Sequence, residues 1–215
     1  MLVLAFDTAT PAVTAAVHDG ERVLAERTTV DARRHGELLV PTIEEVLRAA
    51  GVTLRDVTAI VSGRGPGPYT GLRVGLATAQ ALASATGAPA YGVCTLDAIA
   101  YAVAADGPFL VATDARRKEV FWGSYDAGGA RLAGPAVDRP DALPGVLPVA
   151  GAGARMYAAT IGPDRVIDPE YPSAGALAAL AAERLAAGAE LEAPLPIYLR
   201  RPDARVPGPP KRVTA

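Results

Sequence analysis

A glycine- and proline-rich segment, residues 63–75, is the stretch of this 215-residue chain whose composition points most directly to chemistry. It connects a short apolar run to a helical pattern, and the first N–H groups of a helix, together with its dipole, attract anions. The segment is not a nucleotide-binding P-loop, because no Gly-Lys-Ser/Thr follows it, and it lacks the Gly-x-Gly-x-x-Gly spacing. Two interpretations stay open: a tight connection with Thr70 as the helix cap, or a contact site for phosphate or a partner.

Histidine and cysteine offer few candidates for metal or nucleophilic chemistry. His35 stands near the start of a predicted helix, but the position four residues later, where a metal-binding helix would place a second ligand, is Leu39. A solvated or capping histidine is the favoured interpretation. Cys94 is the single cysteine, which excludes an internal disulfide and a cysteine-based zinc site. We therefore predict no metal.

Two aspartates follow apolar, strand-like runs: Asp7 begins Asp-Thr-Ala-Thr, and Asp114 begins Asp-Ala-Arg-Arg-Lys-Glu. In sugar kinases and actin-like ATPases, an aspartate at this point opens a glycine-rich phosphate loop. Ala9 and Thr10 remove that glycine flexibility, and the second segment is charged rather than glycine-rich. Both aspartates could simply cap turns. No serine has the surroundings of a nucleophile elbow, so we predict no catalytic residue.

The elements that would position these groups follow an α/β pattern. Strands predicted at 2–6, 13–18 and 22–30 form an antiparallel meander, because Asp19-Gly20 is a hairpin signal. Helices and strands then alternate, which predicts parallel crossovers and an α/β fold. The alternating elements are expected at residues 36–50 (helix), 57–62 (strand), 71–86 (helix), 91–94 (strand) and 96–105 (helix).

An Asp-Gly-Pro sequence at 106–108 is the expected boundary between two units, 1–106 and 107–204, which a mobile tail at 205–215 follows. The second unit opens with another strand that ends on aspartate, Asp114, and this repetition hints at a duplicated fold whose second copy is reduced. The other elements expected in this unit are strands at 119–125 and 131–137 and a helix at 174–187.

Small residues recur every four positions along the predicted helix 71–86, at Gly71, Gly75, Ala79 and Ala83. Such a strip lets another backbone approach closely. Because leucines lie off the strip, the helix has two apolar faces, and one of them could dock a second chain. Packing of the strip on this chain's own sheet is the alternative, and the pattern alone leaves both open.

Charge and hydropathy restrict the possible partners. Asp and Glu number 23 against 21 Lys and Arg, a formal charge of −2, which disfavours a protein that binds nucleic acid mainly through phosphate contacts. The chain reaches Asp7 after a short apolar run without a basic leader, and no apolar run is long enough to span a bilayer. We expect a cytoplasmic protein without membrane contact.

Several motifs occur in an ordered series along nearly the whole chain. They are Asp7-Thr8-Ala9-Thr10, His35-Gly36-Glu37-Leu38-Leu39, the loop 65–75, Asp114-Ala115-Arg116 with Glu119-Val120, and Pro196 with Tyr198-Leu199-Arg200. This series resembles the TsaB (YeaZ) family. The resemblance implies an actin/hexokinase-like (ASKHA) fold with two ribonuclease-H-like lobes, the second reduced. The catalytic relatives of that family, the TsaD proteins, carry two histidines four residues apart, where this chain has His35 and Leu39.

The resemblance implies a helper rather than an enzyme. It implies a subunit that activates TsaD, which transfers a threonylcarbamoyl group to N6 of the adenosine beside the anticodon in tRNA. It also implies a TsaE-like ATPase as a further partner, homodimers through the same helices, only indirect contact with tRNA, and no cofactor beyond a nucleotide that could sit at the partner interface. Replacing Gly75 with leucine is expected to abolish the complex and leave the fold intact. The expected docking residues are Leu39, Ile43, Gly71, Leu72, Gly75, Leu76 and Ala79.

Two other classes of function are weighed against this one. A glycopeptidase-like hydrolase or a kinase-like nucleotide hydrolase would need a metal pair, an activated nucleophile or a glycine-lined phosphate loop, and the sequence offers no such group. A direct tRNA-binding module would use basic residues near the end of the chain, which the overall charge disfavours. Those residues are Arg200, Arg201, Arg205, Lys211 and Arg212.

Overall fold

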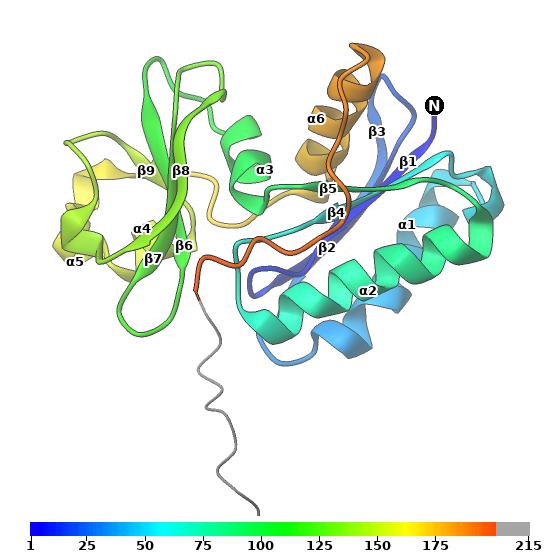
Figure 1. Ribbon diagram of the computed structural model, residues 1–215, viewed down its shortest axis with the longest axis horizontal. Helices are drawn as coiled ribbons and strands as arrows, with labels where there is room; N and C mark the ends of the chain where they lie inside the picture. Colours follow the sequence, from blue (N-terminus) through cyan, green and yellow to red (C-terminus); the bar gives the residue numbers. More distant parts are fainter. Residues whose placement is uncertain (201–215) are drawn as a thin grey trace, which may run out of the picture.

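The computed structural model describes residues 1–200, apart from the side chain of Tyr69, and it contains two five-stranded sheets that lie side by side (Figure 1). The predicted tail at 205–215 and its basic residues lie outside the described residues. The first sheet has the order β3-β2-β1-β4-β5, and the second has the order β10-β9-β6-β7-β8. The strands are β1 (Val3–Asp7), β2 (Ala12–His18), β3 (Val23–Val30), β4 (Ala59–Gly63), β5 (Ala90–Val93), β6 (Phe109–Asp114), β7 (Val120–Tyr125), β8 (Arg131–Asp138), β9 (Val149–Ala150) and β10 (Val166–Ile167).

The two sheets share one topology. In the first, β1 pairs antiparallel with β2 and parallel with β4; in the second, β6 pairs antiparallel with β7 and parallel with β9. The duplication that the two strand-aspartate motifs hinted at is thereby confirmed. β9 and β10 have two residues each, so the second copy is the reduced one. The fold is the predicted actin/hexokinase-like arrangement of two ribonuclease-H-like lobes, called the first and second lobe below.

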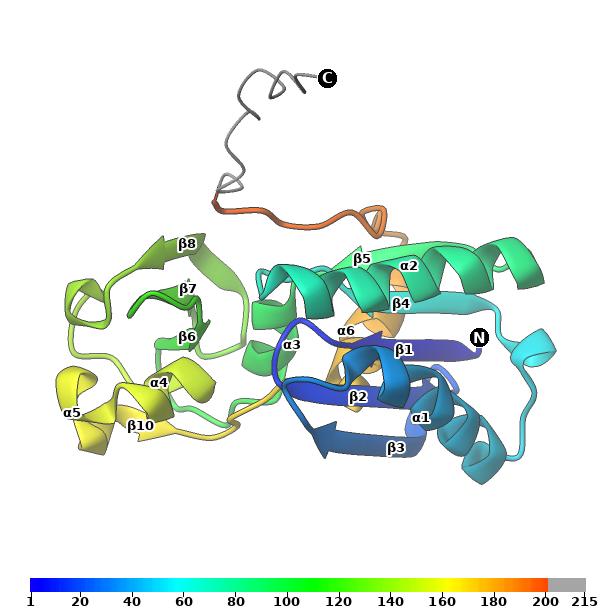
Figure 2. The ribbon, with the colours of Figure 1, turned by 90° about the horizontal axis from the view of Figure 1, so that it is seen from below.

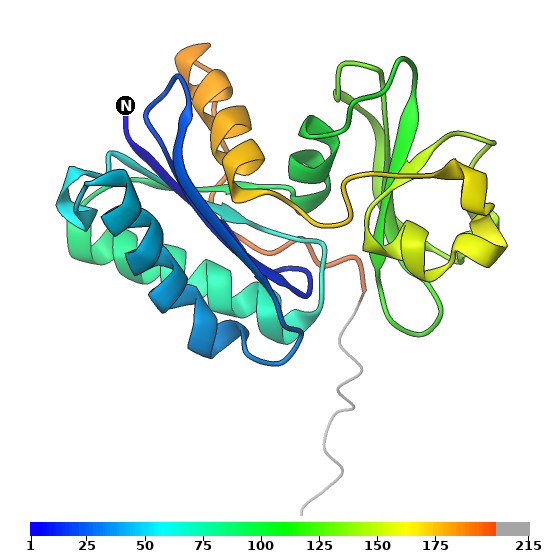
Figure 3. The ribbon, with the colours of Figure 1, turned by 180° about the vertical axis from the view of Figure 1, so that it is seen from behind.

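Helices cover both faces of the first sheet: α1 and α2 lie on one face and α6 lies on the other (Figures 2 and 3). α3 lies between the two lobes, whereas α4 and α5 are short and belong to the second lobe (Figure 1). Within residues 1–200, no helix has the length and hydropathy needed to cross a membrane. The helices are α1 (His35–Ala50), α2 (Tyr69–Thr86), α3 (Thr95–Tyr101), α4 (Ala152–Met156), α5 (Ala158–Ile161) and α6 (Ala174–Ala186), with single 3-10 turns at Leu54–Asp56, Pro140–Ala142 and Pro163–Arg165.

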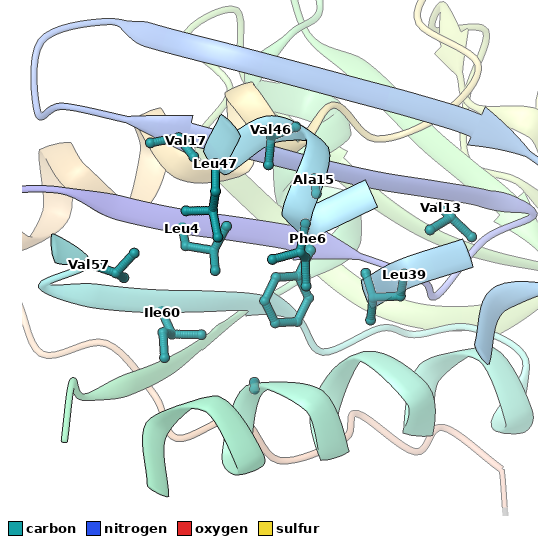
Figure 4. Packing of buried hydrophobic residues seen from close by; sticks show 12 residues of the cluster. Leu4, Phe6, Val13, Ala15, Val17, Leu39, Val46, Leu47, Val57 and Ile60 are labelled. Carbon is teal, nitrogen blue, oxygen red and sulfur yellow. The ribbon is translucent and has the colours of Figure 1, made fainter. Parts of the chain in front are cut away.

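The core of the first lobe is built on the alternation of side chains along β1. Leu4 and Phe6 point toward α1 and α2, where they pack with Leu39 (Figure 4). Val3 and Ala5 point to the opposite face and pack beneath α6. Because successive strand side chains point to opposite faces, a strand covered on both sides must be apolar throughout, as β1 is up to its last residue.

The position of α6 corrects the predicted boundaries of the two units. The prediction assigned this helix to the second unit, 107–204, but it packs on the first sheet. Its Leu177 and Ala181 are buried in a cluster with Val3 and Val61. The physical reason is that the apolar second face of the first sheet needs a cover, and the alanine-rich helix can approach that face closely. The order of elements along the sequence does not reveal this return.

A buried carboxylate on α3 joins the two lobes. Asp97 is 5% exposed and accepts a hydrogen bond from the Tyr125 hydroxyl on β7, with an oxygen–oxygen distance of 3.0 Å. It also pairs with Arg131 of β8 at 3.4 Å and with Arg184 of α6 at 3.6 Å. One side chain therefore connects the helix that covers the first sheet with two strands of the second sheet.

Candidate functional site

A cavity of about 210 Å³ brings together the segments that the sequence singled out for chemistry. The loop after β1, the start of α1 and the glycine-rich start of α2 all line it, and one residue of the β6–β7 hairpin lines it from the second lobe. Its lining includes Thr8, Thr10, Arg33, His35, Gly71 and Arg116.

Asp7 lies at the end of β1, beside this cavity but not among its lining residues. It is fully buried, with one carboxylate oxygen accepting the N–H of Ala9 at 2.6 Å and the other accepting the Thr95 hydroxyl at 2.6 Å. Burial raises the pKa of Asp7 from 3.8 to about 6, although the two hydrogen bonds and the charge of His35 act in the opposite direction. Asp7 therefore holds the β1–β2 loop in place from inside the protein.

The glycines at the start of α2 are explained by close approach to that same loop. A Cβ at Gly67 would lie 2.0 Å from the Ala9 carbonyl oxygen, and one at Gly71 would lie 2.5 Å from the Thr8 carbonyl oxygen. The Thr8 hydroxyl donates to the Gly71 carbonyl and accepts the N–H of Gly75, at 2.8 and 3.0 Å. The segment is thus the tight connection of the first interpretation.

The predicted cap of α2 is wrong. The helix begins at Tyr69 with Pro68 in the cap position, and it has no side-chain cap. Thr70 is exposed in the first turn and lines the cavity. Proline sets the backbone angle for helix entry, so the turn forms without a capping hydroxyl.

His35 is the first residue of α1, and it is tied to the β1–β2 loop. Its Nε2 lies 2.8 Å from the Thr10 carbonyl oxygen. Because a carbonyl can only accept, Nε2 carries the hydrogen. Leu39, one turn later, is fully buried in the core, so this helix presents no second histidine beside His35. Residues 1–200 contain no group of three or more His, Cys, Asp or Glu side chains that could hold a metal ion.

The residues predicted to dock a partner are buried inside this chain, so the prediction of which side chains form that surface is wrong. Leu39, Leu72 and Ala79 have no exposed surface. A Cβ added to Gly75 would lie 2.7 Å from the hydroxyl oxygen of Thr8. The strip of small residues packs on the chain's own sheet and β1–β2 loop, which was the alternative for this pattern. The buried set is Leu39, Ile43, Gly71, Leu72, Gly75, Leu76 and Ala79.

A different face of the same helices is exposed, and the sequence interpretation missed it. On α2 the exposed positions include Ala77, Gln80, Ala81 and Ser84, and Val40 of the neighbouring α1 is 51% exposed. These α2 positions recur with the same helical spacing as the buried strip but are offset from it. Periodicity shows that a helix has two uncharged faces, but it does not show which one meets the sheet.

The β6–β7 hairpin carries a basic tip in an unusual backbone conformation. Arg116, Arg117 and Lys118 have φ values of 61°, 56° and 60°, a region that costs non-glycine residues about 1–2 kcal/mol each. The Arg200 guanidinium holds the base of the hairpin, because it donates to the Ala115 carbonyl at 2.7 Å and pairs with Glu119. Arg200 is therefore engaged within the fold.

Comparison with known proteins gives consistent matches. Residues 22–186 match the family model described as TsaD: tRNA N6-adenosine threonylcarbamoyltransferase. An uncharacterized protein of Mycobacterium tuberculosis is 49% identical over 209 residues, which cover 94% of this chain and 93% of that protein. The tRNA threonylcarbamoyladenosine biosynthesis protein TsaB of Escherichia coli is 38% identical over 128 residues, 58% of this chain and 55% of TsaB. The solved structure of YeaZ from Pseudomonas aeruginosa is 32% identical with a TM-score of 0.79, and the match covers 92% of this chain and 99% of that one.

Proposed function

Because this chain belongs to the TsaB (YeaZ) family, within the wider family of the TsaD model, we propose that it is a non-catalytic subunit that binds and activates a TsaD-type threonylcarbamoyltransferase. The complex would transfer a threonylcarbamoyl group to N6 of the adenosine beside the anticodon in tRNA. Besides the family membership, one observation carries the proposal: the exposed face of α2 is almost free of charge.

Arg73 is the sole charged residue in the whole of α2. A helix side turned to water normally carries several charged residues, whereas this one carries alanine, glutamine and serine. α1 extends the face, because a Cβ added to its Gly36 would lie 4.0 Å from the Val74 side chain of α2, and the exposed Val40 follows one turn later. We call the set Val40, Ala77, Gln80, Ala81 and Ser84 the docking face. Its small side chains would allow a partner helix to approach closely.

The groups that could have performed chemistry are engaged within the fold. Asp7 is buried under its own loop, and His35 donates to the Thr10 carbonyl. The burial of Asp7 and the hydrogen bond of His35 favour a non-catalytic role for this chain, in which the partner supplies the reacting groups. A second copy of this chain could occupy the docking face when the partner is absent, and a TsaE-like ATPase would join the assembled pair. We place tRNA on the partner rather than on this chain.

Substitution on the docking face should break the complex. Ala77→Glu with Ala81→Glu places two charges on α2 at exposed positions that tolerate glutamate in a helix. We expect at least about tenfold weaker binding to the TsaD-type partner, because the charges would be desolvated at the interface. Co-elution on size exclusion and formation of threonylcarbamoyladenosine in a reconstituted reaction are the measurements.

The matched control is Ala186→Glu, an exposed alanine at the end of α6 on the opposite face of the sheet. It should leave both measurements unchanged. The docking proposal fails if the double variant co-elutes and supports modification as well as wild type. Gly75→Leu does not serve as the test, because Gly75 packs against Thr8 and a leucine there would disturb the fold itself. Modification by the chain alone would refute the non-catalytic role, and reactions with and without ADP test the nucleotide expected at the partner interface.

A further inference from the structure

We propose that two ties between the lobes hold the second lobe at one angle, and that activation of the TsaD-type partner requires this angle whereas docking does not. The first tie is Asp97 on α3, and the second is the segment 192–200, called the strap below. The part of the proposal that concerns activation rests on the proposed function. The existence of the ties does not.

The covalent connections between the lobes do not by themselves fix an angle. The chain crosses from the first sheet to the second through residues 102–108, between α3 and β6, and it returns to α6 through residues 168–173. Lobes that are joined by a few loop residues commonly rotate about those residues as hinges. A fixed angle therefore needs non-covalent contacts that cross the boundary.

The helix α3 packs on both lobes with apolar side chains. Its Leu96 and Ile99 are buried in a cluster with Phe109 of the second sheet. Ala98 belongs instead to the cluster of the first lobe that includes Val3. Burial of apolar surface is non-directional, so on its own it specifies the angle between the lobes only loosely.

Asp97 supplies directional bonds at the same boundary. Its buried carboxylate accepts the Tyr125 hydroxyl at 3.0 Å and lies 3.4 Å from Arg131, and both partners belong to the second sheet. Arg184 of α6 lies 3.6 Å from the other carboxylate oxygen. Removing a carboxylate from water is costly, and apolar residues often stabilise a boundary equally well. We therefore attribute this buried ionic group to the choice of one lobe angle rather than to stability.

The strap is attached to the first lobe at its beginning. The Glu192 carbonyl accepts the N–H of Gly92 on β5 at 2.7 Å, and the Glu192 side chain pairs with Arg64, which follows β4. A Cβ added to Gly92 would lie 2.7 Å from the Ala193 carbonyl oxygen, so the strap passes directly against this edge of the sheet. Figure 1 shows the strap, in orange to red, running past β5 toward the second lobe.

The end of the strap is attached to the second lobe. The N–H of Ile197 still donates to the Arg64 carbonyl, at 2.9 Å. Three residues later, the Arg200 guanidinium donates to the Ala115 carbonyl at 2.7 Å and pairs with Glu119, both in the β6–β7 hairpin. The strap thus holds the hairpin to the first lobe at a point separate from Asp97, and two separate points restrain a rotation that one would permit.

The location of the docking face separates docking from activation. That face lies entirely on α1 and α2 of the first lobe, whereas the two ties restrain the second lobe. The second lobe meets these helices where Arg116 lines the cavity at their first turns. A change of lobe angle therefore leaves the docking face unaltered and moves the second lobe relative to the bound partner. In this proposal Asp97 and Glu119 are positioning residues.

The double variant Asp97→Asn with Glu119→Gln tests both ties, because it removes their charges and keeps the size of each side chain. Asparagine can still accept the Tyr125 hydroxyl, so we expect the fold to persist, with circular dichroism and the unfolding temperature as checks. Affinity for the partner should change less than about twofold, as for distant sites. Formation of threonylcarbamoyladenosine at saturating chain concentration should slow at least about fivefold.

The matched control is Asp164→Asn with Glu190→Gln, the same chemical changes at two exposed positions outside the ties. It should leave the affinity and the rate unchanged. If the test double variant does not fold, Glu119→Gln alone takes its place, because Glu119 lies in the hairpin and outside the buried clusters.

Spin labels measure the lobe angle without the partner. Thr29→Cys on β3 and Met156→Cys on α4 place one label on an exposed position of each lobe, and the native Cys94 is buried. Pulsed electron resonance on the full chain should give one narrow distribution of label distances. Adding Asp97→Asn and Glu119→Gln should broaden it, and adding the control pair should not.

The readouts fail in different ways. Label distances that stay narrow in the test variant overturn the proposal, and so does a broadened distribution with a wild-type rate of modification. A loss of affinity equal to the loss of rate also overturns it, because the ties would then serve docking. If wild type neither docks nor activates the partner, the proposed function fails and the assignment to activation falls with it, while the labels still decide whether the ties fix the angle.

Discussion

The ends of β1 and β6 occupy the same place in the two copies of one topology, and each ends on an aspartate. In the first lobe Asp7 is fully buried and both its oxygens are bonded within the protein. In the second lobe the Asp114 side chain is 12% exposed and bonds to the backbone and side chain of Arg116 within its own hairpin. One aspartate became part of a core, and the other orders a basic loop at the surface.

The difference follows from what covers each strand end. The start of α2 lies across the loop after β1, and a Cβ added to Gly63 on the neighbouring β4 would lie 1.7 Å from the Asp7 carboxylate. The second lobe has no long helix in the corresponding position, since β9 is followed by the five-residue α4. The β6–β7 hairpin therefore remains free to carry Arg116 toward the first lobe. The shorter helix after β9 leaves the loop after β6 more exposed than the loop after β1.

The largest effect on stability is expected from substitution of Gly63, which lies against the buried Asp7 of the first lobe. Gly63→Ala should destabilise the protein by more than about 4 kcal/mol, because the new methyl group and the buried Asp7 carboxylate cannot share the space. Urea unfolding measures this loss, and Gly107→Ala, with no atom within 4 Å of the added Cβ, is the control. Asp7→Ala added to Gly63→Ala should restore part of the stability by removing the carboxylate. No coupling between the two substitutions would contradict the packing described here.

The pH dependence of stability gives the next largest effect. The pKa of Asp7 is about 6 in the folded chain, and an unfolded chain has the ordinary value near 3.8, so the folded state binds the proton more tightly. The contribution of Asp7 to the free energy of unfolding is therefore largest below about pH 4, where Asp7 is protonated, and it falls by about 3 kcal/mol as pH rises to about 7.

Asp7→Asn removes this contribution. Urea unfolding at a series of pH values should show that the variant lacks the fall seen in wild type across that range. The difference between the two curves isolates Asp7, because the other titrating groups are shared. Parallel curves would mean that Asp7 does not differ from a surface aspartate, and the contrast with Asp114 would be lost.

The smallest effect is expected in the second lobe. Asp114→Ala removes the acceptor for the Arg116 N–H at 2.8 Å and an ion pair that is largely exposed on the arginine side, so we expect a loss of about 1 kcal/mol. Urea unfolding at neutral pH is the measurement, and Asp106→Ala in the exposed connection between the sheets is the control. A loss as large as that of Gly63→Ala would show that both strand ends are equally built into a core.

Strand and helix positions in the first lobe could be predicted from sequence, because apolar alternation and glycine turns are local signals. The duplicated topology could be inferred from the repeated strand-aspartate pattern. What could not be predicted depends on contacts between distant segments. The orientation of α2 is one case, since Ala77 and Ala79 lie in equally uncharged faces and only the sheet decides that Ala79 is buried. The left-handed backbone of Arg116 is another, because no glycine or asparagine marks it.

The cavity illustrates the same limit. His35 and the glycine-rich segment were recognised as separate candidates, and their meeting place was not, because it depends on how the β1–β2 loop crosses α2. In the sequence, Arg116 belongs to the charged segment that follows Asp114. Arg116 comes from the second lobe, so its place in the cavity lining depends on the angle between the lobes. Asp97 helps to fix that angle through its ion pairs with Arg131 and Arg184.

The return of α6 to the first sheet has a consequence for synthesis of the chain. Val3 and Ala5 leave the ribosome early, but the helix that shields them from water ends at Ala186. During translation the nascent first sheet therefore keeps one apolar face open until nearly all of the chain has emerged. A growing chain in that condition is a natural client for chaperones that bind exposed apolar strands.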